Sequence, residues 1–158
     1  MEDEFREYRI EQAGAWLDRI RRMGVKVRTL EGEIAELRAD AEGLKALDYT
    51  RERVSMSPSG DRMAEIAALV FDKLDEFTDE YGGYMFERER ARSCIMRLPD
   101  ERHAAVLVRR YLSGQLWKEI SESMGYDLRT VYRLRADGLC ELYDLMPPTE
   151  RDPIPSAM

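Results

Sequence analysis

The residues best suited to chemistry lie between Leu128 and Ala136, a segment that holds three arginines, one threonine and one tyrosine but no acidic residue. The chain as a whole carries a formal net charge of −7, so this basic segment is a local feature. Arginine side chains fit the edges of guanine bases, and hydroxyl groups suit backbone phosphates. An acidic residue here would be repelled by phosphates, so the segment predicts contact with a defined site on double-stranded DNA. The side chains expected to contact DNA are Lys118, Arg129, Thr130, Tyr132, Arg133 and Arg135.

A short helix, a glycine turn and a second helix would position these side chains. Ile120 and Met124 lie four apart on the first helix, and Gly125 follows where a tight turn needs positive φ. Asp127 can cap the next helix. Apolar residues of the two helices would then meet and leave the arginines outside, which is typical of a helix-turn-helix. The residues of the expected core are Ile120, Met124, Gly125, Val131 and Leu134. The same spacing also suits an ordinary three-helix bundle with a solvated arginine face, which stays open as the alternative.

These helices belong to a C-terminal module that we place at residues 99–146. Pro99 ends the preceding helix, and Asp100 can cap a short new helix. We expect Ala105, Val108 and Leu112 to form the inner face of that helix. Residues 147–158 contain four prolines and show no periodicity, so they are predicted to be a disordered tail.

The N-terminal residues 1–47 are predicted to form one long helix, because apolar residues recur in steps of four and three. This heptad spacing is typical of a coiled coil, and β-branched residues at the a positions with leucines at d favour two parallel strands. The residues of the expected dimer seam are Ile20, Val27, Leu30, Ile34, Leu37 and Leu44. In a parallel homodimer the charged pairs between chains would be Lys26–Glu31, Glu33–Arg38 and Asp40–Lys45.

A linker at residues 48–61 and a second long helix at residues 62–98 are expected next. Pro58 and Gly60 break the helical pattern, and the segment YGGY at 81–84 predicts a kink or break in the second helix. The fold class is therefore all-α, with long coiled-coil helices followed by the helix-turn-helix module. The two long helices also permit an antiparallel hairpin within one chain, or hairpins that pair into a bundle, so the choice between dimer and hairpin stays open.

The segment LPDERHAAVLVRRYLSGQLWKEISESMGYDLRTVYRL resembles region 4 of the bacterial sigma-70 family. A Leu-Pro start, an Arg-Tyr-Leu-x-Gly hinge, a Glu-Ile pair, a glycine turn and a Thr-Val pair carry the resemblance. Together with the long helix before it, the module is similar to small regulators of phages and prophages. This resemblance implies a transcription regulator that binds promoter DNA, with RNA polymerase as a further partner. Leu128-Arg129 and Arg133 depart from the sigma pattern, which favours a phage-specific operator over the standard −35 hexamer.

The sequence indicates no enzyme, cofactor or metal site. His103 is the only histidine and lacks a partner constellation, and Cys94 and Cys140 have no metal-ligand spacing. No signal peptide or membrane-spanning run is present, so we expect no membrane contact and a location in the cytoplasm of a bacterial host cell. Two other functions stay open: a phage DNA-packaging protein of the small-terminase type, and an adaptor that binds RNA polymerase.

Overall fold

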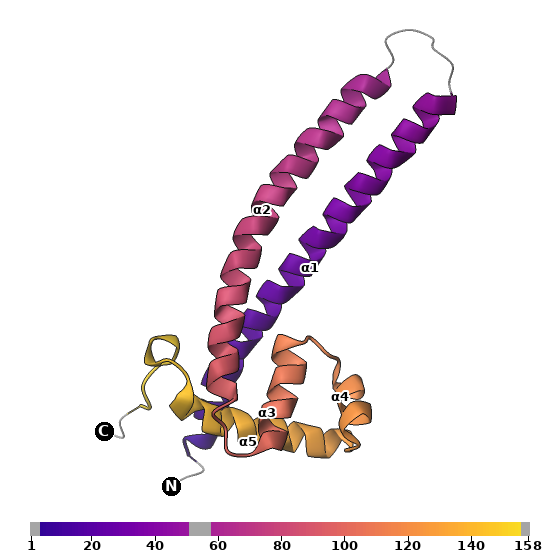
Figure 1. The fold of residues 1–158 in the computed structure, drawn as a ribbon. Coiled ribbons are helices and arrows are strands. Elements are labelled where there is room, and N and C mark those ends of the chain that lie inside the picture. Colours follow the sequence, from indigo (N-terminus) through magenta and orange to yellow (C-terminus); the bar gives the residue numbers. More distant parts are fainter. Residues whose placement is uncertain (1–3, 51–57, 156–158) are drawn as a thin grey trace. The chain divides into compact units, whose positions relative to one another are not determined.

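The regular elements of the protein are all helical (Figure 1). The computed structural model describes residues 4–50 and 58–155, and no strand occurs in these ranges. The elements are α1 (Arg6–Thr50), α2 (Pro58–Ile95), α3 (Glu101–Leu107), the π-helix η1 (Val108–Leu112), α4 (Trp117–Met124), α5 (Leu128–Leu145) and the 3-10 helix η2 (Pro148–Glu150). The expected all-α class is therefore confirmed.

The long helices differ from the expected bounds at their ends. Helix α1 continues to Thr50, and α2 begins at Pro58, where a proline suits the first helical position. Part of the expected linker, residues 51–57, lies outside the described residues. The predicted break at YGGY is wrong, because α2 runs without interruption through these residues. Tyr84 explains the difference: its side chain is buried and its hydroxyl donates to the Leu112 carbonyl at 3.4 Å, so tertiary packing offsets the low helix propensity of two glycines.

The chain divides into two compact units, one with residues 1–25 and 84–158 and the other with residues 26–83. In the second unit, Lys26 Nζ lies 2.7 Å from Glu80 Oε1, and Lys73 Nζ lies 2.6 Å from Glu33 Oε2. Residue numbers rise along α1 as they fall along α2 in these pairs, so the two helices run antiparallel within the unit. The charged partners expected from a second chain are thus replaced by partners in α2.

The seam residues of this unit are buried by the same chain. Val27, Leu30 and Ile34 are only 5–6% exposed, while Leu37 and Leu44 are half-buried. Within one chain the structure has the antiparallel hairpin, which is one of the arrangements that the heptad pattern permits. A helix of the same chain is held nearby by its loop, so it meets the seam at a higher effective concentration than a second copy would. A dimer through this seam would have to displace α2.

The other unit has its own core, to which α1, α2, α3 and α5 contribute. On α1, the buried residues Ala13, Trp16, Leu17 and Ile20 follow helical spacing. Helix α5 contributes Leu139, Leu142 and Tyr143. Helices α3 and α5 approach closely at Gly138, where an added Cβ would lie 3.1 Å from His103 Cβ and 3.3 Å from Leu107 Cδ1. Glycine at this position therefore sets the spacing between α3 and α5.

The structure describes the predicted disordered tail as far as Pro155, and hydrogen bonds join it to the rest of this unit as far as Pro153, whose carbonyl accepts from the Tyr8 hydroxyl at 3.1 Å. Glu150 accepts from Arg19 and from Arg90, each at 2.8 Å. The Asp152 amide donates to Gln12 Oε1 at 3.0 Å, and the Tyr143 hydroxyl donates to the Asp152 carbonyl at 2.6 Å. Ion pairs and single hydrogen bonds hold this segment, and such contacts leave no hydrophobic periodicity in a sequence.

Candidate nucleic-acid interface

The turn between α4 and α5 is set by two local features. Gly125 has φ 71° and ψ 25°, the left-handed conformation that glycine adopts without steric cost. Asp127 then caps α5, since its Oδ1 accepts from the Thr130 amide at 2.8 Å. The hydrogen bond with Thr130 lowers the pKa of Asp127, and the nearby charges of Arg129 and Arg133 lower it further. The acidic cap is therefore ionised beside two arginines at the start of α5.

Helices α4 and α5 are held together by a small apolar cluster. Ile120 and Val131 are fully buried, Leu134 is 2% exposed, and Val106 of α3 completes the cluster. Met124 is half-buried against it, together with Trp117 and Tyr126. The structure thus brings together all the apolar residues of the expected core. Sequence spacing missed Val106, because a residue outside the two helices carries no signal of contact with them.

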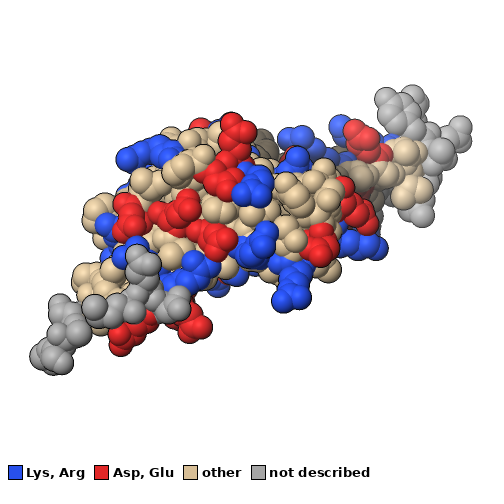
Figure 2. Space-filling model, turned by 90° about the horizontal axis from the view of Figure 1, so that it is seen from below, with Lys and Arg blue, Asp and Glu red and all other residues tan. Residues whose placement is uncertain are grey.

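Arg129, Tyr132 and Arg133 lie exposed on the first turns of α5. Tyr132 is 46% exposed, and the spacing of three and four residues puts the three side chains on one helix face. In the part of the chain that the structure describes, neither Arg129 nor Arg133 forms an ion pair. Lys118 is also exposed, and Thr130 is half-buried. On the face shown in Figure 2, Lys and Arg side chains are interspersed with Asp and Glu side chains, so the described part of this face carries no extended positive patch.

Arg135, which is also expected to contact DNA, is half-buried and differs in this from the exposed Arg129 and Arg133. Its Nε donates to the Tyr111 hydroxyl at 2.8 Å, and its Cζ lies 5.9 Å from the centroid of the Trp117 ring. A Cβ added at Gly14 of α1 would lie 3.7 Å from Arg135 Nη2, so this guanidinium reaches between α5 and α1. The sequence holds a signal for this, since Arg135 follows the buried Val131 by four residues and so shares its helix face.

Trp117, the first residue of α4, is surrounded by side chains from three elements. Arg110 of η1 places its Cζ 4.7 Å from the centroid of the indole ring. Tyr132 of α5 packs edge-on, with ring centroids 5.2 Å apart and an interplanar angle of 69°. Arg110 also donates from Nη1 to the Gln115 carbonyl at 3.2 Å. Arg110 was not among the residues expected from sequence, since it lies outside both helices of the turn.

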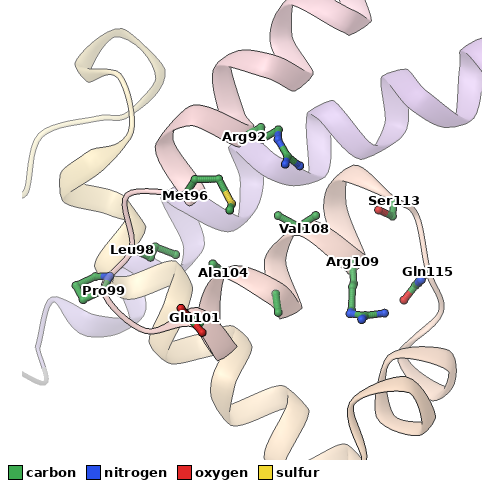
Figure 3. A pocket seen from close by; sticks show the side chains of 11 residues that line it. Arg92, Met96, Leu98, Pro99, Glu101, Ala104, Val108, Arg109, Ser113 and Gln115 are labelled. Atoms are coloured by element: carbon green, nitrogen blue, oxygen red, sulfur yellow. The ribbon is translucent and has the colours of Figure 1, made fainter.

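An open groove of about 680 Å³ lies beside α3 and η1 (Figure 3). Arg92 lines it from α2 and Met96 from the turn that follows α2, while Ala105, Val108 and Arg109 line it from α3 and η1. The expected inner face is therefore wrong in part: Ala105 and Val108 are half-buried in this groove, whereas Ala104, Val106 and Leu107 face the core. The contact of α3 with α5 explains the difference, because it selects the helix face that passes Gly138.

His103 lies in the α3–α5 contact. It is 7% exposed, with Nε2 3.6 Å from Asp100 Oδ2 and Nδ1 3.5 Å from Glu141 Oε2. Among the described residues, no group of three or more His, Cys, Asp or Glu side chains is placed to hold a metal ion. Burial raises the pKa of the Cys94 thiol, and the nearby Arg97 and Arg90 oppose this shift.

No family model, curated protein or solved structure matches this chain. None of the helices in the described ranges is both long enough and apolar enough to cross a membrane.

Proposed function

We propose that residues 99–146 form a helix-turn-helix that binds a specific site on double-stranded DNA, with the first turns of α5 in the major groove. The chain would then be a transcription regulator of the phage or prophage type, acting in the bacterial cytoplasm, with a sigma region 4-like head on a coiled-coil arm. The resemblance in sequence supports this family, and the arrangement of α4 and α5 supports the mode of binding.

The observation that carries the proposal is the exposed face formed by Arg129, Tyr132 and Arg133. Val131 and Leu134 hold this face outward by packing on Ile120. In the described structure the two guanidinium groups form no direct ion pair, and Asp127 acts on them only at longer range, so their donors are available to base edges and phosphates.

The hairpin formed by α1 and α2 would act as the arm of the regulator. Its seam is covered within the chain, so a homodimer would have to use outer faces of the two helices. Two heads related by two-fold symmetry would bind half-sites separated by whole helical turns, roughly 10 base pairs each. Solution mass tests this part, since a dimer supports a regulator and a ring-sized assembly would favour a packaging protein.

Selection of bound DNA from a random pool, followed by footprinting, tests the function. Arg129→Ala and Arg133→Ala should each weaken specific binding by about 1–3 kcal/mol, which is roughly 5- to 150-fold. Binding by the unaltered chain should fall steeply with added salt. Arg38→Ala is a matched control, because it removes the same charge from an exposed position of residues 26–83. If no sequence is enriched from the pool, the proposal is wrong.

The groove beside α3 favours a second candidate function, an adaptor that binds a protein partner such as RNA polymerase. Met96 is 58% exposed in this groove, and the arginines Arg92 and Arg109 flank the apolar surface. An adaptor would keep its activity after the two changes Arg129→Ala and Arg133→Ala and lose it after Arg92→Ala with Arg109→Ala. The DNA-binding regulator gives the opposite result with the first pair.

A further inference from the structure

We propose that Arg110, which stacks on the indole ring of Trp117, binds a backbone phosphate of DNA next to the exposed face of α5. This inference rests on the proposed function and extends the contact surface from α5 to η1. It also adds Arg110 to the expected set, because Arg110 and Arg135 both place their guanidinium groups over the Trp117 ring.

Arg110 and the α5 face are linked through a single ring. The Arg110 Cζ lies 4.7 Å from the centroid of the Trp117 ring. The centroid of the Tyr132 ring lies 5.2 Å from the same Trp117 centroid. Arg110 and Tyr132 are therefore no more than about 10 Å apart. Arg110 and Tyr132 thus lie next to the same ring, and Tyr132 belongs to the exposed α5 face that also holds Arg129 and Arg133.

The π-helical form of η1 contributes to this placement. The Ser113 amide donates to the Val108 carbonyl at 2.9 Å, a step of five residues rather than four. The wider turn changes the direction of the side chains that follow, and Arg110 lies within it. Single π-helical turns occur often at functional sites. The Gln115 carbonyl then holds one end of the guanidinium at 3.2 Å.

Charge completes the case for an anion at this position. Arg110 and Arg135 both lie within 6 Å of the Trp117 ring centroid. In the described parts of the chain, neither of them forms an ion pair with a carboxylate. A guanidinium has five N–H donors, and Arg110 uses one on Gln115, so donors remain for a phosphate. Half-buried positive charge is stabilised when an anion supplies the missing partner.

Trp117 would act in this surface as a positioning residue. Its indole is packed against the apolar cluster of Val106, Ile120 and Val131, so its orientation is set by the core. A flat aromatic ring keeps a guanidinium in one plane, as cation–π contacts do. Replacing the indole by a phenyl ring would preserve this platform, whereas an aliphatic side chain would remove it.

The salt dependence of DNA binding tests the proposal with the full chain. Each phosphate neutralised adds about 0.9 to the slope of log K against log salt, so Arg110→Met should reduce the slope by about 1. Methionine keeps an unbranched stem on the indole, and Arg110→Gln is a second neutral variant should the first fold poorly. Arg38→Met in residues 26–83 is the matched control, with an unchanged slope. Arg110→Lys should restore the slope.

Trp117 variants separate positioning from stability. Trp117→Leu should lower the slope of log K against log salt as Arg110→Met does, and Trp117→Phe should keep it. These slopes should not follow the thermal midpoints of the two variants, because they report the position of Arg110 and not overall stability. Inorganic phosphate alone, followed by Trp117 fluorescence, distinguishes the ligands. If phosphate competes with DNA and this competition is lost in Arg110→Met, the site is supported. If phosphate changes the Trp117 fluorescence but Arg110→Met leaves the salt slope of DNA binding unchanged, the proposal is refuted.

The outcomes for the two proposals are distinct. If the unaltered chain selects no DNA sequence, the proposed function fails and this inference fails with it. If the chain selects DNA and Arg110→Met leaves the slope unchanged, only the role of Arg110 is refuted.

Discussion

Replacing Gly138 by alanine tests whether the close approach of α3 and α5 sets the position of α5. An added Cβ would lie 3.1 Å from His103 Cβ and 3.3 Å from Leu107 Cδ1. The first of these atoms is joined directly to the backbone of α3, and Leu107 is fully buried. Neither neighbour can move aside as a flexible side chain would, so α3 and α5 must separate by several tenths of an ångström.

Two opposing effects determine the sign of the result. Alanine in a helix interior is more favourable than glycine by about 1 kcal/mol. Overpacking of a well-packed contact costs about 1–3 kcal/mol. We therefore expect Gly138→Ala to destabilise the protein by ~1 kcal/mol, with a range of about 0–2. For a chain of this length, ~1 kcal/mol corresponds to a decrease of about 2–4 °C in Tm.

Gly14→Ala is the matched control in the same unit. A Cβ at Gly14 would lie 3.5 Å from Leu139 Cδ1 and 3.7 Å from Arg135 Nη2, which are ordinary contacts. This change keeps the helix-propensity gain without the overlap, so Tm should rise by about 2–4 °C. Thermal and urea unfolding measure both variants, and DNA selection measures the effect on α5. A rise in stability for Gly138→Ala equal to that for Gly14→Ala would refute the close-packing argument.

Three further predictions concern the turn, the tail and the hairpin. Gly125→Ala places a Cβ at φ 71° and should lower the free energy of unfolding, measured in urea, by about 1–2 kcal/mol. Gly125→Asn should lower it less, because asparagine tolerates the left-handed conformation. Equal decreases for the two variants would contradict the left-handed turn. Burial raises the pKa of Glu150, but hydrogen bonds and charges from its two arginine partners outweigh this and hold it below its usual 4.5. The unaltered chain should therefore lose stability as the pH falls through about 4.5 and below. Glu150→Gln should lose less stability between pH 7 and about pH 3. If the free energy of unfolding of both proteins falls in parallel with pH, the ion pairs of Glu150 do not contribute. Lys26→Glu should lower the thermal midpoint of unfolding, and the double variant Lys26→Glu with Glu80→Lys should restore it. If the effects of the two changes on stability are additive, the ion pair between Lys26 and Glu80 does not form.

The features that sequence predicted well are those with local causes. The helical class follows from apolar spacing along each helix. The turn at Gly125 and the cap at Asp127 depend on backbone conformation and on a hydrogen bond between residues three apart, so both are visible in a short window. The exposure of Arg129 and Arg133 follows in the same way, because the helix period places them opposite Val131 and Leu134.

Other features were decided only by contacts between distant residues. A heptad seam requires a partner helix, and the pattern is satisfied equally by a second chain or by α2. Within one chain, the pairing of Lys26 with Glu80 shows α2 in this place. Arg135 is half-buried because Tyr111 and Trp117 approach it from other elements. Glu150 of the tail pairs with Arg19 and Arg90 although the tail has no apolar periodicity.

The division has one physical reason. Periodicity, turns and caps are properties of neighbouring residues, so the sequence alone determined the helices, the glycine turn and the exposed arginine face. Other features depend on which surfaces meet after folding. They are the burial of the seam by α2, the partial burial of Arg135, the contacts of the tail, and the position of Arg110 over Trp117. That choice depends on the sum of packing, charge and chain-closure terms over the whole molecule, and only the tertiary structure determined it.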